Sequence, residues 1–492
     1  MNKEQSTILK SVAILLLLLF QVLSIIKMQG QPNIIWPSLP ILNIETIDGV
    51  MPTRTIVSAP EGCTGVSITD NNYVPGRMTM TLNGNKIYDS GDYIKSESGM
   101  RIKIRGNSTG AYLNQHPYKI KLSKKYDLLR RNDKAFKHKE WLLMSMYTWN
   151  SEMTNQESNI LNIVGSIVSK IVHKEWVPEY DFVNVIMNGQ YQGMYYLMEA
   201  VEKGDKRINI DDTGFLLEHD TFWWNEELYF KTDYQNYATG YTYKYPDEDD
   251  ITDSIQTVFK DYLNEFEKVL YSNGDISKYI DMESFAKWIL IHDILGSTDE
   301  AGCNRFICKY DMNKDNPYSS KIEMGPAWDF DSSFKSKGWS YIHQSSSWFY
   351  YSKLFERNDF QQIYIHLWQT IRPTILSAIQ EYFDEVWKKY GDSFDENMKI
   401  HQTKYPTEGQ QGFHSQIEEV IEKLTERIYL LDELMKQYKQ TDDINIALQE
   451  NYMISITDII GHHYHTTDIH QLPQGIYILQ YNDQKSKKII VR

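Results

Sequence analysis

The chain has 492 residues, 41% of them hydrophobic and 24% charged, with a formal net charge of −15 at pH 7. The length predicts two or three structural units, and the composition excludes a chain that is disordered as a whole. The acidic balance argues against a nucleic-acid-binding surface, because neutralising nucleic-acid phosphates requires clustered Lys and Arg side chains. A local basic site for a small phosphorylated ligand is still compatible with this charge.

The N-terminal segment has the layout of a secretory signal. Two lysines precede an apolar run from Val12 to Phe20, which continues with two polar interruptions to Ile26. The run is shorter than the roughly 20 apolar residues that a membrane-spanning helix needs. We therefore expect residues 1–33 to direct export, either as a cleaved signal peptide or as an N-terminal anchor.

Residues 34–125 are predicted to be rich in β-structure. Short apolar or alternating segments separated by turn residues indicate strands, namely LPILNIETID (39–48), RMTMTLNGNKIYD (77–89), MRIKIRGNS (100–108) and YKIKL (118–122).

The following segment combines a helix with further strands. The apolar spacing changes to a helical pattern from Trp141 to Ile171. FVNVIMNGQYQGMYYLMEAV (182–201) then predicts a hairpin that turns at Asn188-Gly189, and GFLLEHD (214–220) is expected to continue the same sheet.

The second half is predicted to be largely helical. Apolar residues at three- and four-residue spacing indicate helices over about 255–270, 285–295, 359–390 and 413–438, with a break at Pro373. The pattern from about residue 446 onward returns to strands. We therefore expect an α+β fold of two lobes, with a β-rich N-terminal part, a helical C-terminal part and a small terminal β segment. The predicted division of the chain is 1–33, 34–125, 126–445 and 446–492.

Two polar segments follow apolar elements in the middle of the chain. Asp299 and Asn304 come after a predicted helix, and Asp329 and Asp331 come after a predicted strand end. Carboxylate and amide oxygens are ligands that Mg²⁺ prefers, and two carboxylates this close repel unless a cation or a proton lies between them. Protein kinases have similar groups in this order. Either segment alone can also be an ordinary helix end or turn, and the two together favour a phosphate-transfer site.

Basic residues for a phosphate come from earlier strands. Arg105 lies in RGNSTG (105–110), where charge and exposed backbone N–H groups can bind an anion, although an ordinary loop is the simpler interpretation. Lys119 and Lys121 alternate outward on a strand, where they can pair with phosphates or can be ordinary edge-strand lysines. Glu199 lies at a strand end, where most acidic residues are solvated.

Taken together, these segments resemble the spore coat protein H-like (CotH) kinase family, whose fold is similar to that of atypical protein kinases. The resemblance covers roughly residues 39–340. It is carried by LPILNIET, RGNST, PYKIKL, NGQYQGMYYLMEAV, GFLLEHD, YKYPDEDD and MGPAWDFD.

This resemblance implies a role for each candidate residue. Asp299 would be the catalytic or metal-associated carboxylate, and Asn304 matches a position that is often Asn or Ser beside the metal. Asp329 would be the main Mg²⁺ ligand with Asp331 supporting it, and Glu199 would lie near the nucleotide.

Two segments depart from the family pattern. Where the family has Lys-Lys-Pro-Tyr or a similar sequence, with a lysine expected to pair with nucleotide phosphates, this chain has Gln115-His116-Pro117-Tyr118. A neutral His does not supply a lysine's charge at pH 7, so Lys119, Lys121 or Arg105 is expected to replace it. The Arg-containing helix expected after WLLMSMY is altered to NSEMTNQESN (150–159).

The C-terminal segment is similar to the sorting domains of secreted Bacteroidetes proteins. LPQGIYIL followed by the basic strand KKIIV is the resembling part. This resemblance implies that the protein is addressed to the cell surface or to the medium.

Three functions are compatible with these residues. The first is an exported kinase-like phosphotransferase that uses ATP and Mg²⁺, or Mn²⁺, on a protein Ser or Thr hydroxyl. The second is a non-catalytic pseudokinase or cell-surface scaffold on the same fold. The third is a metal-dependent hydrolase, against which the lack of accompanying His ligands argues. The expected partners are a protein substrate and the cell envelope, not nucleic acid, and the sequence carries no signal for the oligomeric state.

Overall fold

The structure, a computed structural model, describes most of the chain between residues 39 and 438. The described ranges are 39–131, 133–146, 160–172, 176–235, 238–297, 303–313, 315–334, 349–406 and 412–438, with the backbone of 453–458, 463–464, 475–481 and 486–491. The predicted export segment, Asp299 and the altered segment 150–159 lie outside these residues. None of the helices in the described ranges combines the length and apolarity that crossing a membrane requires.

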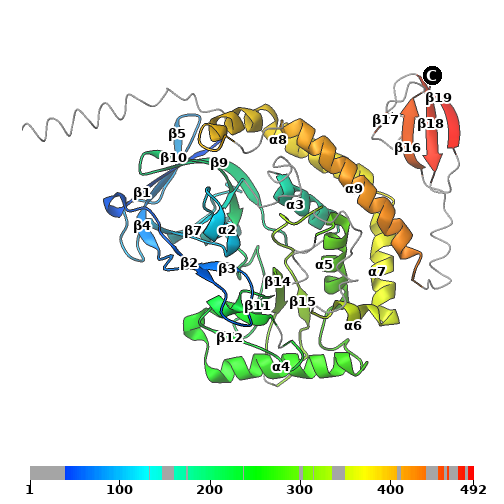
Figure 1. Cartoon of the computed structure of the whole chain (residues 1–492), viewed down its shortest axis with the longest axis horizontal. Coiled ribbons are helices and arrows are strands. Elements are labelled where there is room, and N and C mark those ends of the chain that lie inside the picture. The colour runs from blue at the N-terminus through cyan, green and yellow to red at the C-terminus, as the bar shows by residue number, and fades with distance from the viewer. Residues whose placement is uncertain are drawn as a thin grey trace, which may run out of the picture.

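The first sheet is eight-stranded and closes on itself like a barrel (Figure 1). β1 pairs in parallel with β9 on one side and antiparallel with β4 on the other, so only β5 remains as an edge strand. The strands are β1 Ile41–Thr46, β4 Val74–Leu82, β5 Asn85–Asp89, β6 Met100–Ile104, β7 Tyr118–Tyr126, β8 His138–Ser145, β9 Tyr180–Met187 and β10 Gln190–Glu199. Closure leaves few unpaired backbone groups for intermolecular pairing.

The second sheet has the strand order β12-β13-β11-β14-β15. Its strands are β11 Phe215–Asp220, β12 Tyr229–Phe230, β13 Gly240–Tyr245, β14 Arg305–Lys309 and β15 Ile322–Met324. Two smaller sheets complete the β-structure, with β2 Thr55–Ser58 and β3 Val66–Thr69 in one, and β16 Met453–Asp458, β17 His463–Tyr464, β18 Gly475–Tyr481 and β19 Ser486–Val491 in the other.

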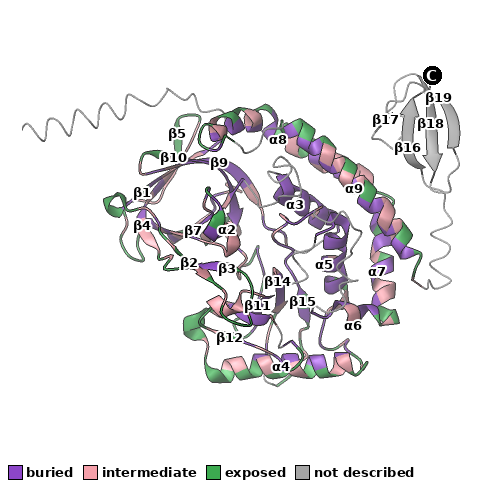
Figure 2. Ribbon diagram, viewed as in Figure 1, coloured by how far each residue is buried: buried purple, intermediate pink, exposed green. Residues whose placement is uncertain are grey.

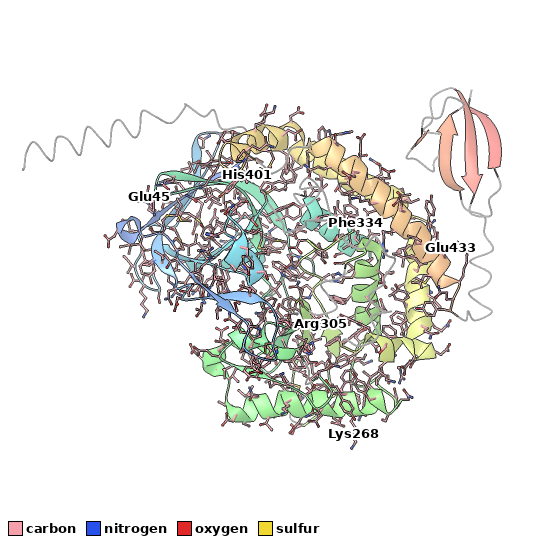
Figure 3. The ribbon with its side chains drawn as sticks, viewed as in Figure 1. Glu45, Lys268, Arg305, Phe334, His401 and Glu433 are labelled. Atoms are coloured by element: carbon pink, nitrogen blue, oxygen red, sulfur yellow. The ribbon has the colours of Figure 1, made fainter. Side chains whose placement is uncertain are left out.

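The helices pack mainly around the second sheet and one side of the barrel (Figure 1). They are α2 Ser108–Tyr112, α3 Leu161–Ile171, α4 Asp253–Tyr271, α5 Met282–Leu295, α6 Tyr351–Phe355, α7 Asn358–Ile371, α8 Ile375–Gln402 and α9 Phe413–Met435. Helix α8 is tied to the barrel, because His401 Nδ1 accepts a hydrogen bond of 3.1 Å from the Met194 backbone N–H of β10 (Figure 3).

Burial separates the central helices from the outer ones (Figure 2). Ten of the eleven residues of α3 are buried, and α5 is buried over most of its length, whereas α4, α8 and α9 alternate buried and exposed positions. A helix that is buried on all sides belongs to the core, while an alternating one covers the core with a single apolar face. Helix α3 therefore packs between the barrel and the other helices.

A small apolar cluster joins the barrel to the second sheet. It brings Leu142 of β8 and Met198 of β10 together with Leu216 of β11, Phe306 of β14 and Trp328. The barrel interior and the helical half have separate larger cores. Because the junction cluster buries apolar surface from both sheets, it fixes how their polar faces oppose each other.

Several sequence predictions are confirmed. The α+β composition is observed, and so are the strands predicted before residue 125 and the helices of the second half. The hairpin turns at Asn188 and Gly189, whose φ angles of 50° and 74° are those that a two-residue hairpin turn of this type needs. The break at Pro373 is also observed, since α7 ends at Ile371 and α8 begins at Ile375.

The helix predicted from Trp141 is wrong over its first turn. Residues 141–145 belong to strand β8, and helix α3 begins only at Leu161. Trp141 and Leu143 face the barrel interior, whereas Leu142 joins the junction cluster on the other face. A strand that is covered on both faces is apolar at every position. Such a run also contains apolar residues at helical spacing, so the sequence pattern fits a helix as well as a strand.

Two further predictions need correction. GFLLEHD does form a strand, β11, but β11 is the centre of the second sheet and does not continue the hairpin sheet. The RGNSTG segment is only partly a loop, because Ser108–Tyr112 form the short helix α2. The alternation of apolar and polar residues along a strand does not show which sheet the strand joins. It also does not reveal a helix as short as a single turn.

Close packing between α3 and the WDFD segment gives a stability prediction. A Cβ atom at Gly165 would lie 2.0 Å from Cγ of Phe330, which is closer than any real Cβ contact. We expect Gly165→Ala to lower the free energy of unfolding by about 1–3 kcal/mol, the usual cost of overpacking, measured by urea denaturation.

A matched control exists in the same helix. The buried hydroxyl of Ser169 makes no hydrogen bond within the described part of the chain, so Ser169→Ala should be neutral or slightly stabilising. Equal stability of Gly165→Ala and the unmodified chain would contradict the packing of Phe330 against α3.

Candidate functional site

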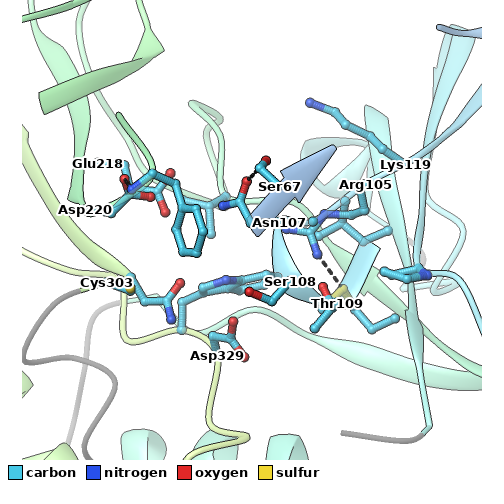
Figure 4. Close-up of a pocket in the computed structure, with 18 of the residues that line it drawn as sticks. Ser67, Arg105, Asn107, Ser108, Thr109, Lys119, Glu218, Asp220, Cys303 and Asp329 are labelled. Atoms are coloured by element: carbon cyan, nitrogen blue, oxygen red, sulfur yellow. Dashed lines mark hydrogen bonds between the residues drawn. The ribbon is translucent and has the colours of Figure 1, made fainter. Parts of the chain in front are cut away.

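A cavity of about 630 Å³ lies between the barrel and the second sheet (Figure 4). The barrel side contributes side chains from β6, β7, β8 and the loop before α2, while the opposite side comes from β11, β13, the start of β14 and the segment after β15. The volume lies within the range of small-ligand and cofactor pockets. Of the sequence-predicted site residues, Arg105, Lys119, Asn304, Asp329 and Asp331 line this cavity.

The register of the second sheet brings three polar residues to one edge. His219 of β11 pairs with Arg305 of β14, so the next positions, Asp220 and Asn304, follow at the same end. β14 in turn pairs with β15, and the Gly325 N–H extends this ladder by donating to the Phe306 carbonyl at 2.8 Å. The chain after β15 therefore returns beside Asn304, which explains why Asp329 also reaches the cavity.

Asn304 and Asp329 share an uncommon backbone conformation. Their φ angles are 58° and 61°, in the left-handed region that Asn and Asp adopt more readily than other side-chain-bearing residues. Asn and Asp at these positions are therefore suited both to the left-handed backbone conformation and to binding a cation through their side-chain oxygens. Residues in such conformations cluster at functional sites, where the surrounding structure holds them.

Two cations in the cavity have no carboxylate partner among the described residues. The Lys103 ammonium of β6 makes no ion pair there and lies 5.1 Å from the centre of the Tyr73 ring. Within the described part of the chain, the Arg105 guanidinium donates one hydrogen bond, to the Met144 sulfur at 3.1 Å, and it lies near the Trp328 ring. Sulfur is a weak acceptor, so both cations retain donors for a ligand.

Burial lowers the pKa of both cations, Lys103 and Arg105. It lowers the pKa of Lys103, and the nearby Lys119 lowers it further. Burial also lowers the pKa of Arg105, against which Asp329 and then Glu218 act as negative charges across the cavity. An anion bound between these cations would offset the cost of keeping charge in a partly desolvated place.

Lys119 and Lys121 share one carboxylate, Glu140 of β8. Lys119 forms an ion pair with Glu140, and Lys121 lies 2.9 Å from its other oxygen. Burial acts against ionisation of Glu140, but the two lysines outweigh it and lower its pKa to about 2. Lys119 lines the cavity, whereas Lys121 does not.

Glu199 lies outside the cavity wall, in a buried ion-pair network. Its side chain is 0% exposed, and it accepts from Arg131 Nη2 at 2.7 Å and from the Glu179 N–H at 3.1 Å. Arg207 Nε lies 3.6 Å away. The described contacts of Glu199 are therefore structural, and its expected place near the nucleotide stays a prediction.

The position where the family pattern has a lysine is also away from the cavity. Neither Gln115 nor His116 is among the lining residues. Gln115 bridges two strands, because its Nε2 donates to the Met194 carbonyl at 2.6 Å and its Oε1 accepts from the Met146 N–H at 2.8 Å.

Comparison with known families gives the following result. The model described as CotH kinase protein matches residues 102–430, which is more than half of the chain. The chain belongs to the CotH kinase protein family. The matched range of this CotH kinase family member begins within β6 and includes β7 to β15, and with them every lining residue from Lys103 to Asp331. No curated protein matches the chain.

Sequence reasoning missed several groups of the CotH kinase cavity. Lys103 alternates with apolar residues in MRIKI as Lys119 does in YKIKL, so the same strand pattern could have identified it. Glu218, Asp220 and Lys244 also line the cavity, from β11 and β13. In the sequence they appear only as polar residues at the end of an apolar strand. Such residues are common at strand ends that have no ligand-binding role.

Glu218 and Asp220 lie side by side on β11 (Figure 4). Lys244 Nζ lies 2.8 Å from Glu218, and Asp220 accepts from the Phe222 N–H at 2.7 Å. Burial, and then repulsion from Glu218, raise the pKa of Asp220 to about 8, although Lys244 and the Phe222 N–H act in the opposite direction. Asp220 is therefore mainly protonated at pH 7 in the absence of a bound cation.

This raised pKa predicts the pH dependence of stability. A carboxyl with a folded pKa near 8 and an unfolded value of about 3.9 binds a proton on folding between these pH values, so it destabilises the fold progressively as pH rises. Asp220→Asn keeps the acceptor for the Phe222 N–H and removes the loss of folding stability that ionisation of Asp220 causes as pH rises. We expect the variant to gain stability over the unmodified chain by up to about 1.4 kcal/mol per pH unit from pH 5 to 8, and to level off above pH 8.

Urea denaturation at pH 5, 6, 7, 8 and 9 measures the effect. Asp212 serves as the control, because Lys203 at 2.7 Å holds its pKa below the usual value and its charge is constant over this range. Asp212→Asn should therefore show no slope. If the difference in unfolding free energy between Asp220→Asn and the unmodified chain does not change with pH, Asp220 is not protonated at neutral pH.

Proposed function

We propose that this CotH kinase family member is an exported phosphotransferase that moves the γ-phosphate of ATP to a Ser or Thr hydroxyl of a protein, with Mg²⁺ or Mn²⁺. One observation carries the proposal. The oxygen ligands Asn304, Asp329 and Asp331 and the cations Lys103 and Arg105 line one cavity. A nucleotide with its cation needs both kinds of group on opposite sides of a polyphosphate.

The acidic side fits a cation that is shared with the ligand. Among the described residues, no group of three or more His, Cys, Asp and Glu side chains could hold a metal ion. Mg²⁺ is usually bound by one or two carboxylates together with waters and substrate phosphates, so an all-protein cage is not required. Asp329 and Asp331, with the amide oxygen of Asn304, would hold the ion. When bound, it would neutralise charge that develops on the transferred phosphoryl group.

The basic side fits a polyphosphate. Lys103 and Arg105 have no carboxylate partner in the described part of the chain and would orient the phosphates, while Lys119 would contribute less because Glu140 already neutralises it. Apolar side chains of the wall, including Leu142, Phe306 and Trp328, would exclude water from this region. By the family resemblance, Asp299 would orient the acceptor hydroxyl and accept its proton.

The fold supports a two-lobed arrangement similar to that of atypical protein kinases. A barrel-like sheet and a helical half with its own sheet have separate cores, and the cavity lies where the junction cluster joins them. In such an arrangement the nucleotide would bind between the lobes. We propose the same for this chain.

The export proposal is based on sequence. The apolar N-terminal run supports a signal peptide or an anchor, and the similarity of the C-terminal segment to secretion sorting domains supports delivery to the cell surface or the medium. The substrate would then be a protein of the cell envelope or outside the cell.

Loss of the main metal ligand tests the phosphotransferase. Asp329→Asn keeps a residue that tolerates a φ of 61° and removes the negative charge. Incubation with labelled ATP and Mg²⁺ or Mn²⁺ should show autophosphorylation of the unmodified protein and at least about a hundredfold less in the variant, as for loss of a charge-stabilising group. Asp261→Asn, on the exposed surface of α4, should retain full transfer.

The same assay distinguishes the scaffold alternative. Nucleotide binding without transfer in the unmodified protein would reject the phosphotransferase and support a pseudokinase. Equal transfer by Asp329→Asn and the unmodified protein would reject the assignment of Asp329.

A pair of lysine variants tests the phosphate-binding side. Lys103 lines the cavity and is unpaired within the described residues, whereas Lys121 pairs with Glu140 outside it. We expect Lys103→Met to weaken ATP binding by about ten- to a hundredfold, the value of a charge-assisted contact, and Lys121→Met to change it little. Isothermal titration calorimetry at two salt concentrations measures both, and equal losses in the two variants would contradict this assignment.

A further inference from the structure

Asn162, in the first turn of α3, is a buried polar side chain that has no hydrogen-bond partner among the described residues. It is 6% exposed, it lines the cavity, and its amide makes no hydrogen bond within the described part of the chain. Because Asn162 lines the cavity, its amide can be hydrated there or can bind a ligand. What exposure remains is toward the cavity, where a ligand can supply the missing bond.

The helix end that carries Asn162 receives no side-chain cap from its own N-cap residue. Helix α3 has eleven residues, and its N-cap residue Ile160 supplies no side-chain hydrogen bond to the first turn. The backbone N–H groups of a first turn have no intrahelical acceptor and carry the positive end of the helix dipole. This end therefore favours an anion over a cation.

The contact between α3 and the WDFD segment directs this end toward the metal-binding residues. Gly165 lies one turn after Asn162, on the same face of the helix, and packs directly against Phe330. Phe330 stands between Asp329 and Asp331, both of which line the cavity. Arg105 lines the same cavity without a carboxylate partner among the described residues.

We infer that the Asn162 side-chain N–H binds a phosphoryl oxygen of the polyphosphate, at the N-terminal end of α3. The inference rests on the proposed function, since it names a further contact of the same ligand. The alternative is that the amide oxygen of Asn162 binds the cation. The positive end of the helix and the nearby guanidinium of Arg105 disfavour that arrangement, because both would repel a cation.

Two substitutions with opposite chemistry test the inference. Asn162→Ala removes the donor, and Asn162→Asp replaces it with a negative charge that repels phosphate but attracts a cation. We expect Asn162→Ala to weaken binding of tripolyphosphate with Mg²⁺ on the order of tenfold, as for a hydrogen bond to a charged group. Asn162→Asp should weaken it further. Isothermal titration calorimetry with the full chain measures both.

A control variant comes from the same cavity. Asn71 also lines it, but its Nδ2 already donates to the Ile104 carbonyl at 2.9 Å. Asn71→Ala should therefore reduce tripolyphosphate affinity less than Asn162→Ala does. Thermal unfolding without ligand provides the stability readout, and because no bond is lost, Asn162→Ala should keep or raise the unfolding temperature.

The outcomes separate the two proposals. Unchanged affinity in Asn162→Ala, while the unmodified protein binds tripolyphosphate and ATP, would overturn this inference and leave the proposed function intact. Retained or tighter Mg²⁺-dependent binding in Asn162→Asp would overturn it in favour of a cation ligand. If Asn162→Ala lowers the unfolding temperature and reduces tripolyphosphate affinity no more than Asn71→Ala does, Asn162 has a structural role only, and the inference is overturned. Failure of the unmodified protein to bind either compound would reject both proposals.

Discussion

The antiparallel register of β11, β14 and β15 is the constraint on which the rest of the site depends. It brings the ends of three strands to one edge, so that Asp220, Asn304 and Asp329 reach the same cavity although they are far apart in the chain. A slip of β11 by one residue would turn Asp220 to the opposite face of the sheet. The apolar residues between them, Phe306 and Trp328, belong to the junction cluster and resist such a slip.

The charged groups around the cavity fall into two kinds that residue type alone does not distinguish. Glu199 forms a buried ion-pair network with Arg131 and Arg207, outside the cavity lining. Lys103 and Arg105, by contrast, have no carboxylate partner in the described part of the chain and remain partly desolvated. A partly desolvated charge without a carboxylate partner lowers stability, so a fold that keeps one gains something other than stability from it. Binding of an anionic ligand is the simplest such gain.

The sequence predicted local structure well where the signal was local. The Asn188-Gly189 hairpin and the break at Pro373 follow from turn and ring geometry within a few residues, and both are observed. The strand at Trp141 was missed because burial on both faces removes the alternation that marks a strand. β11 was assigned to the wrong sheet because strand pairing over long sequence distances leaves no local trace.

The same distinction applies to the site. The polar motifs around Asn304 and Asp329 could be recognised because each is a compact segment in a known order, and both line the cavity. Lys103 and Asn162 were missed since each lies in an ordinary amphipathic or apolar pattern, and only the fold shows that they face a cavity. Asp299 lies outside the described residues, so its role stays a prediction.

Gln115 stands at one of the two positions where the family pattern has lysine, and its contacts give a physical explanation for the change at that position. Gln115 donates to Met194 of β10 and accepts from the Met146 N–H at the end of β8. A lysine has donors only, so it could not accept the bond from Met146, and a buried backbone N–H would lose its partner. Within the described residues the cations of the cavity come instead from β6 and the loop after it, from β7 and from β13. The absence of a lysine there is therefore compatible with the proposed phosphate-binding side, whose cations come from other strands, and by itself it does not argue for a pseudokinase.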